Sequence, residues 1–134
     1  MQVSGANVGS VIVAEIPDLR ADIGEREDLP HLMFMELFLW AESSVRNGKS
    51  DDMARALRLV DTIFRDCDDK IKNAVTVSFL ERMDPDDEVG RQMFDALTPE
   101  LRKQWDALDE YSLQFIGKSV RGHVAREAER KRSE

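Results

Sequence analysis

The sequence predicts an all-α protein, with five to six helices in a compact bundle or a short stack of antiparallel helical hairpins. Between residues 53 and 74, apolar residues recur at alternating intervals of four and three, as on one face of a helix. Patterns typical of helix starts recur along the chain. No two segments have the alternating pattern and turn of a strand pair. The 134 residues suffice for one domain with one core.

The chain divides into three parts. Residues 1–28 are expected to form an N-terminal extension, in which residues 11–16 could be a short helix or an extended piece and residues 21–28 a polar connection. Residues 29–117 are expected to form the helical domain. Residues 118–134 are expected to form a basic tail that is partly disordered or loosely helical.

The first clear helix is expected at residues 29–47. Asp28 could cap its start, Pro30 suits the first turn, and Gly48 suits the stop. Because the middle of this segment is apolar on nearly every side, it is either the central helix of the fold or one covered by a partner. The apolar run at residues 32–41 is too short to span a membrane.

A second helix start follows at Ser50, with a capping hydroxyl and then two acids. The helical row that follows consists of Met53, Leu57, Val60, Phe64, Cys67, Ile71 and Ala74. The row permits one helix as far as residue 83, but we expect two helices with a break near Asp68, because the aspartates there are weak helix formers. Residues 75–80 are rich in β-branched residues, yet they continue the row and are expected to be helical.

Two further helix starts have a proline. Asp84 and Pro85 are expected to open a short helix that reaches residue 97, and Thr98 and Pro99 a longer one. The expected buried stripe of the longer helix consists of Leu101, Trp105, Leu108, Ser112 and Phe115.

The charges are unevenly divided. Residues 1–117 hold 24 acidic and 13 basic side chains, a net charge of −11, whereas residues 118–134 hold six basic and three acidic side chains, a net charge of +3. An acidic body repels nucleic acid and anionic membranes and attracts basic partners. We therefore expect a protein partner, with no nucleic acid and no membrane, and we interpret the basic tail as a solvated terminus.

No recognisable catalytic or metal-binding motif is present. The sequence has no nucleophile elbow and no phosphate-binding glycine loop. His31 and His123 lack the spacing of a di-iron bundle, and the acidic runs lack the glycine of a calcium loop. Cys67 is expected to be a buried, reduced thiol of a cytoplasmic protein and a poor nucleophile, since aspartates surround it. We expect no metal, no cofactor and no enzymatic activity.

Two glutamates interrupt apolar segments. A carboxylate at Glu36 or Glu81 would be costly if it were buried without a partner. Each is therefore expected either to form a salt bridge with an arginine of a neighbouring helix or to be exposed. The alternative is that each lies in a partner-binding groove.

The remaining acids are candidates for contact with a basic partner. Four of five adjacent positions beside the rigid Pro85 are acidic, so this segment comes first, although it also suits a helix start. In order of priority, the candidates are Asp84, Asp86, Asp87 and Glu88; then Asp61, Asp66, Asp68 and Asp69; then Asp106, Asp109 and Glu110.

Three segments carry a resemblance to a known group of proteins: residues 73–81 (NAVTVSFLE), 59–61 (LVD) and 97–101 (LTPEL). With them, residues 30–115 resemble a family of small bacterial all-helical proteins, some of which are similar to the toxin-immunity proteins of interbacterial competition. The resemblance implies an all-helical fold without a cofactor. It also implies a cytoplasmic protein that blocks a basic toxin domain with carboxylates in place of phosphates.

Two functions follow as hypotheses. The first is a non-enzymatic binding protein, an immunity protein that neutralises a cognate bacterial toxin through its acidic surface. The alternative is a structural or adaptor module that works as a homo-oligomer through its apolar helices. Sedimentation at several concentrations separates them, because the first does not require self-association.

Overall fold

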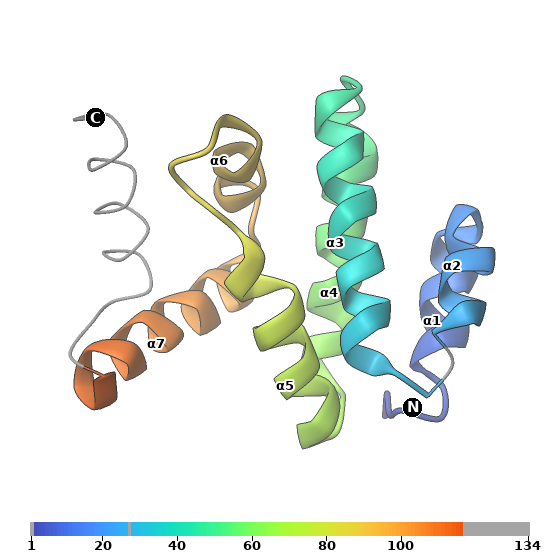
Figure 1. Cartoon of the computed structure of the whole chain (residues 1–134), viewed down its shortest axis with the longest axis horizontal. Helices are drawn as coiled ribbons and strands as arrows, with labels where there is room; N and C mark the ends of the chain where they lie inside the picture. Colours follow the sequence, from blue (N-terminus) through green and yellow to red (C-terminus); the bar gives the residue numbers. More distant parts are fainter. Residues whose placement is uncertain (1, 27, 117–134) are drawn as a thin grey trace.

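A 17-residue helix, α3, lies at the centre of the molecule (Figure 1). The computed structural model describes residues 2–26 and 28–116, with the side chains of residues 109–116 left out. The elements are α1 (Val8–Glu15), η1 (Pro17–Leu19), α2 (Arg20–Glu25), α3 (Pro30–Arg46), α4 (Ser50–Arg65), α5 (Asp69–Ser78), η2 (Leu80–Arg82), α6 (Glu88–Asp95) and α7 (Pro99–Ile116), where η denotes a 3₁₀ helix. The predicted all-α class is confirmed for the described residues. No helix among them is both long and apolar enough to cross a membrane.

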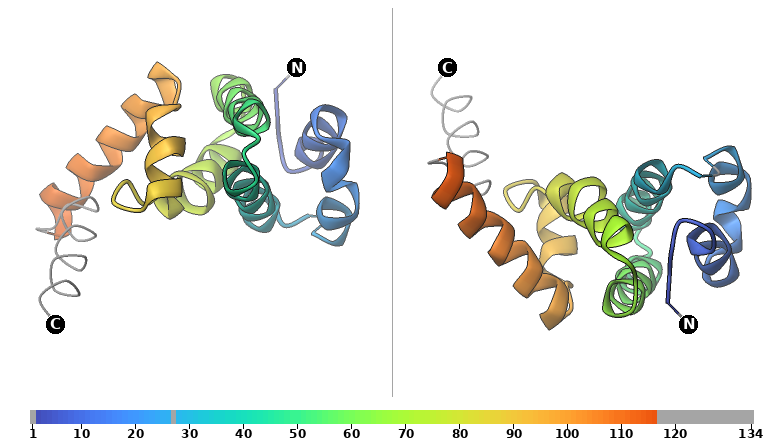
Figure 2. Two further views of the ribbon diagram at one scale, coloured as in Figure 1. Left: turned by 90° about the horizontal axis from the view of Figure 1, so that it is seen from above. Right: turned by 90° about the horizontal axis from the view of Figure 1, so that it is seen from below.

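Helix α3 is buried along one side over its whole length. It packs against α4 and α5 and also contacts α1, α2 and α6. Phe34, Leu37 and Ala41 on this side have no exposed surface. Figure 2 shows α3 and α4 between the α1–α2 pair on one side and α5, α6 and α7 on the other. One core cluster therefore includes side chains from the helices on both sides of the α3–α4 pair.

The predicted helix number is wrong, since the described residues form seven α-helices. The additional helix is α2, which occupies most of the segment expected to be a polar connection. It is six residues long and has a single buried side chain, Ile23, so it shows no periodicity that a sequence pattern could detect. Packing against α1 and α3 stabilises it instead. Both α1 and α2 fall within the predicted N-terminal extension, and their buried side chains belong to the same core cluster as those of α3.

The end of α3 is as predicted, but its start is not. Gly48 has a φ of 72°, and the amides of Gly48 and Lys49 donate to the carbonyls of Val45 and Ser44 in a Schellman stop. Leu29, without a side-chain cap, precedes α3. Asp28 lies one position too early to cap the helix and has a φ of 66°, in the left-handed region that Asp tolerates better than most residues.

The predicted break between two helices near Asp68 is confirmed. Helix α4 ends at Arg65, and the Asp68 carboxylate caps α5 by accepting a hydrogen bond from the amide of Ile71 at 2.9 Å. Residues 66–68 between the helices form a single parallel bridge with the N-terminal segment: the Val3 amide donates to the Asp66 carbonyl, and the Asp68 amide donates to the Val3 carbonyl. A start similar to that of α5 was expected at Ser50, but Ser50 is the first residue of α4 and does not cap it.

The start of the helix after Pro85 is corrected, and that of the last helix is confirmed. Helix α6 begins at Glu88 and is capped by Asp87, whose carboxylate accepts from the amide of Gly90 at 3.1 Å. Thr98 caps α7, because its hydroxyl accepts from the Leu101 amide at 3.3 Å. The predicted tail at residues 118–134 lies outside the described residues, as do the side chains of Ser112 and Phe115.

Candidate functional site

Residues 84–88, called the acidic loop below, connect η2 to α6. Met83 and Pro85 are buried and anchor the loop to the core. Asp86, Asp87 and Glu88 are exposed, whereas Asp84 is half-buried. The loop therefore exposes three of its carboxylates to solvent, while the burial of Met83 and Pro85 holds its backbone in place.

Two of the four carboxylates in the acidic loop accept hydrogen bonds from backbone amides. The Asp84 carboxylate accepts from the Asp86 amide at 2.9 Å in an Asx turn, and Asp87 caps α6. Among the described residues, Asp86 and Glu88 have no side-chain hydrogen bond or ion pair, so their full charge faces solvent. The guanidinium of the nearby Arg91 pairs with the carboxylate of Asp95, 3.4 Å away, and not with Asp86 or Glu88.

Gly90 fixes the path of the acidic loop over α6. A Cβ atom at this position would overlap the carbonyl oxygen of Asp84 and lie 2.8 Å from its carbonyl carbon. The backbone of the loop thus crosses the first turn of α6 at a distance that only glycine permits. Sequence analysis did not identify Gly90, because no local pattern shows which backbone will lie against it.

The second acidic segment, residues 66–69, is called the acidic turn below. Here the carboxylate of Asp68 caps α5, and the backbone of Asp66 pairs with Val3. Asp69 lies exposed in the first turn of α5, where a negative charge stabilises the helix dipole. The acidic turn and the acidic loop lie at opposite ends of the α5–η2 segment (Figure 1), so they do not form one surface cluster.

Asp61, predicted as a contact residue, is part of the internal structure. Its carboxylate accepts from the Thr98 hydroxyl at 2.9 Å and pairs with Arg65 at 2.9 Å, and its side chain is only 16% exposed. It therefore joins α4 to the start of α7. Asp106 is exposed on α7, and the side chains of Asp109 and Glu110 lie outside the described part of the molecule.

The two glutamates in apolar segments differ. Glu36 pairs with Arg26 across the α2–α3 corner at 3.5 Å, as the salt-bridge interpretation predicts. Glu81 lies in η2 and is exposed as a residue, yet partial burial of its carboxyl raises the pKa above the ordinary value of 4.5. Neither lines the groove beside α1, which is described below, or the shallow pocket at residues 48–52.

Cys67 and His31 lie in positions that suit structural roles. Cys67 is buried and free, and burial first, then the neighbouring aspartates, raise the pKa of its thiol, while Lys72 opposes them. Nδ1 of His31 lies 2.9 Å from the hydroxyl of Ser78 and links α3 to the end of α5. His123 lies outside the described residues. The described residues include no group of three or more His, Cys, Asp or Glu side chains that could hold a metal ion.

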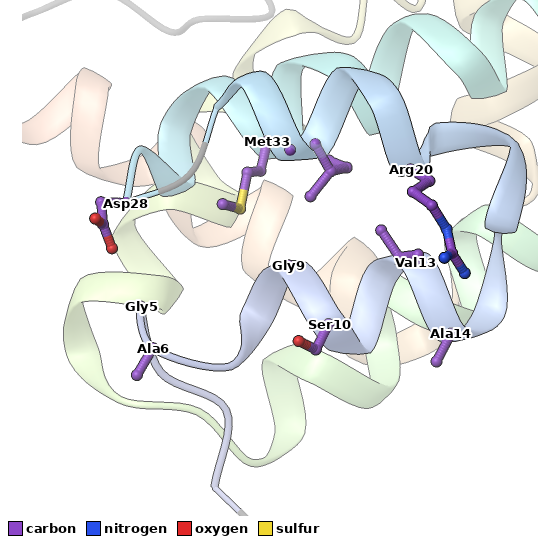
Figure 3. Close-up of a pocket in the computed structure, with 11 residues that line it drawn as sticks. Gly5, Ala6, Gly9, Ser10, Val13, Ala14, Arg20, Asp28 and Met33 are labelled. Atoms are coloured by element: carbon purple, nitrogen blue, oxygen red, sulfur yellow. The ribbon is translucent and has the colours of Figure 1, made fainter.

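A groove that the sequence analysis did not anticipate lies between α1 and the α2–α3 corner (Figure 3). Its volume is about 490 Å³, within the size range of ligand pockets. Gly9, Val13, Ile23 and Met33 supply its apolar lining. One feature of the sequence could have indicated it, since residues 2–14 contain no charged side chain in a chain that is 34% charged.

Comparison with known proteins identifies the family but no activity. The model of a domain of unknown function, DUF7674, matches residues 10–113, which include every helix from α2 to α6. Neither the curated proteins nor the solved structures contain a match to this chain.

Proposed function

The chain belongs to the DUF7674 family, and we propose that it is a non-enzymatic binding protein that captures a basic protein through the acidic loop. The observation that carries the proposal is the exposed state of Asp86 and Glu88 on a loop whose backbone is fixed by buried Met83 and Pro85. Since the loop is ordered before binding, little conformational freedom is lost when a partner docks.

The charge of the whole chain supports the same partner. A net charge of −8 raises the local concentration of cations and accelerates encounter with a basic protein. Val89, half-buried directly after the loop, offers apolar surface beside the carboxylates. The predicted contacts at the acidic turn and Asp106 become secondary, because they lie on other elements than the loop.

The finer proposal is that the partner is the basic domain of a bacterial toxin and that this chain is its immunity protein. It rests on the resemblance of residues 30–115 to immunity-like proteins and on the acidic charge. Domains that bind nucleic acid have cationic surfaces for phosphates, and closely spaced carboxylates compete for the same surface. The acidic loop, with Asp86, Asp87 and Glu88 exposed, is the described surface that best fits this form of inhibition.

Affinity capture with matched variants tests the proposal. Wild type, the double variant Asp86→Lys/Glu88→Lys and the control Asp51→Lys/Asp52→Lys serve as baits in lysate of the native cells. The two variants change net charge equally, and the control alters acids in the first turn of α4 instead. We expect one basic protein to be retained by wild type and control and lost by the loop variant. Equal capture by all three baits would contradict the role of the loop.

The immunity function requires a second experiment with the captured protein. We expect its expression alone to stop growth of a bacterial host and co-expression of this chain to restore growth, whereas co-expression of the loop variant should not. A captured protein that is harmless when expressed alone would refute toxin neutralisation but leave the binding function intact.

A further inference from the structure

The groove between α1 and the α2–α3 corner has an uncharged wall. Helix α1 and the segment before it have no charged side chain until Glu15, which pairs with Arg55 of α4. Surface helices normally carry charged residues on their outer face. Here the exposed positions among residues 5–14, before Glu15, are Ala6, just before the helix, and Ser10 and Ala14 within it.

Small residues lie in two adjacent rows along α1 and the turn before it. Ala6, Ser10 and Ala14, at intervals of four, form an exposed ridge, and Gly5 and Gly9 lie beside it in the groove. A Cβ atom at Gly9 would lie 3.2 Å from Ile23 and 3.4 Å from Met33, so a larger residue would fill the groove. A ridge of small residues beside a groove is a surface that another helix can approach closely.

Opposite charges mark the two ends of the groove. Figure 3 shows Arg20 at one end and Asp28 at the other, with the small residues of α1 between them. Both residues are exposed, and no ion pair is formed by either within the described part of the chain. The charged residues of the groove lining therefore differ between its two ends, with Arg20 at one end and Asp28 at the other.

We propose that this groove is the contact surface for a second copy of the chain, with the two α1 helices antiparallel about a two-fold axis. The axis lies across the groove, so the ridge of each copy enters the groove of the other. Arg20 of each copy then faces Asp28 of its partner. The parallel arrangement would instead place like charges together.

The charges at the two ends of the groove favour a second copy as its occupant, because a two-fold rotation brings Arg20 of one copy to Asp28 of the other. Two copies that each carry a net charge of −8 repel one another wherever acidic surfaces meet. The groove and ridge avoid this repulsion, because their middle is uncharged and their ends are complementary to themselves. A surface of one short helix is smaller than the roughly 1,200 Å² of a standard interface, so we expect a weak dimer.

Sedimentation velocity tests the proposal first. Over a range from about 10 µM to about 1 mM, we expect the weight-average sedimentation coefficient of wild type to rise from that of a monomer toward that of a dimer. Ser10→Arg places a long side chain on the ridge without touching the core and should keep the protein monomeric. Ser43→Arg, the same exchange at an exposed position of α3, is the matched control and should dimerise as wild type does.

Charge reversal tests the antiparallel arrangement. Arg20→Asp alone and Asp28→Arg alone each place like charges at both ends of the interface and should weaken self-association at least tenfold. An equimolar mixture of the two variants should dimerise again, because each contact then joins opposite charges. Asp28→Asn, which suits the left-handed backbone, shows by its thermal unfolding whether loss of the carboxylate alone disturbs the fold.

Two outcomes would overturn the proposal. A wild-type protein that remains monomeric over the whole range excludes the dimer. A dimer that persists in Ser10→Arg, or a mixture of the charge variants that gains nothing over either alone, assigns self-association to another surface. Neither outcome bears on capture of a basic protein by the acidic loop.

Discussion

The acidic turn and the acidic loop have similar compositions but different uses for their carboxylates. In the turn, Asp68 caps α5, and the backbone beside it is bridged to Val3. In the loop, Asp84 and Asp87 organise the backbone, whereas Asp86 and Glu88 remain exposed without a side-chain partner among the described residues. Capping aspartates thus serve folding in both segments, and the loop in addition has two exposed acids that are available for binding.

The difference arises from the position of each acid relative to free amides. An aspartate one residue before a helix has unpaired amides within reach and is used by the fold. Asp86 lies between Asp84, which forms the Asx turn, and Asp87, which caps α6, and its own side chain stays exposed to solvent. The number of acids in a sequence therefore overestimates the size of a binding surface. The capping geometry shows which of them belong to the fold and not to that surface.

The largest expected effect is that of Gly90→Ala. Although alanine favours helix, its Cβ would overlap the carbonyl of Asp84, so the acidic loop or the start of α6 must move. We expect a loss of about 1–3 kcal/mol in the free energy of unfolding, measured by urea denaturation. Partner capture should weaken as well, because the loop is displaced.

Gly24→Ala is the matched control. Gly24 also lies in a helix, but a Cβ atom there meets nothing within 4 Å. This variant should be unchanged or more stable by up to about 1 kcal/mol. Equal effects of the two exchanges would show that the loop does not depend on its close approach to Gly90.

Single alanine substitutions test most directly whether the two acidic segments have different roles. Asp68→Ala removes the cap of α5 and should cost about 1 kcal/mol of stability without altering partner capture. Asp86→Ala should change stability by less than about 0.5 kcal/mol yet reduce capture. Thermal unfolding and binding, measured on both variants, check the prediction, and a reversed pattern would exchange the roles of the two segments.

Asp61→Ala tests whether Asp61 belongs to the internal structure and not to the contact surface. The Thr98 hydroxyl loses its acceptor on α4, and Arg65 loses its partner, so α7 is held less firmly at its start. We expect a loss of about 1 kcal/mol in stability by chemical denaturation. Partner capture by the folded variant should equal that of wild type, and a specific loss of capture would return Asp61 to the contact surface.

Glu81→Gln should have the smallest effect, and one that depends on pH. Because partial burial raises the pKa of Glu81 above 4.5 in the folded state, folding favours the protonated carboxyl. The unfolding free energy of wild type therefore falls as the pH rises from about 4.5 through the folded pKa. The variant should have a slightly higher melting temperature at pH 7 and an equal one at pH 4. A lower melting temperature at pH 7 would mean that the Glu81 charge is stabilised.

The sequence predicts the helices that have periodic burial and strong terminal residues. The end of α3 at Gly48, the break at Asp68 and the cap at Thr98 follow from local chemistry. Helix α2 and the start of α6 do not, because the first depends on packing against α1 and the second on the folding back of the loop over Gly90. Both are long-range effects that no local window contains.

The same limit applies to the site. Sequence analysis identified the acidic loop from its density of acids, but it also assigned Asp61 to the surface, because Thr98 is 37 residues away along the chain. The groove was missed since its walls come from α1, α2 and α3. Only the run of 13 uncharged residues at positions 2–14 pointed to it, and that run looks like an unstructured end until its burial is known.

The central claim is that the acidic loop receives the partner, and its most direct test is the association rate constant measured against ionic strength. For the captured basic protein and wild type, we expect the rate to fall steeply as salt is added, since long-range attraction is screened. For Asp86→Lys/Glu88→Lys the rate should be lower at low salt and the dependence flatter, whereas Asp51→Lys/Asp52→Lys should lie closer to wild type. Identical rates and salt dependences for wild type and the loop variant would contradict the claim.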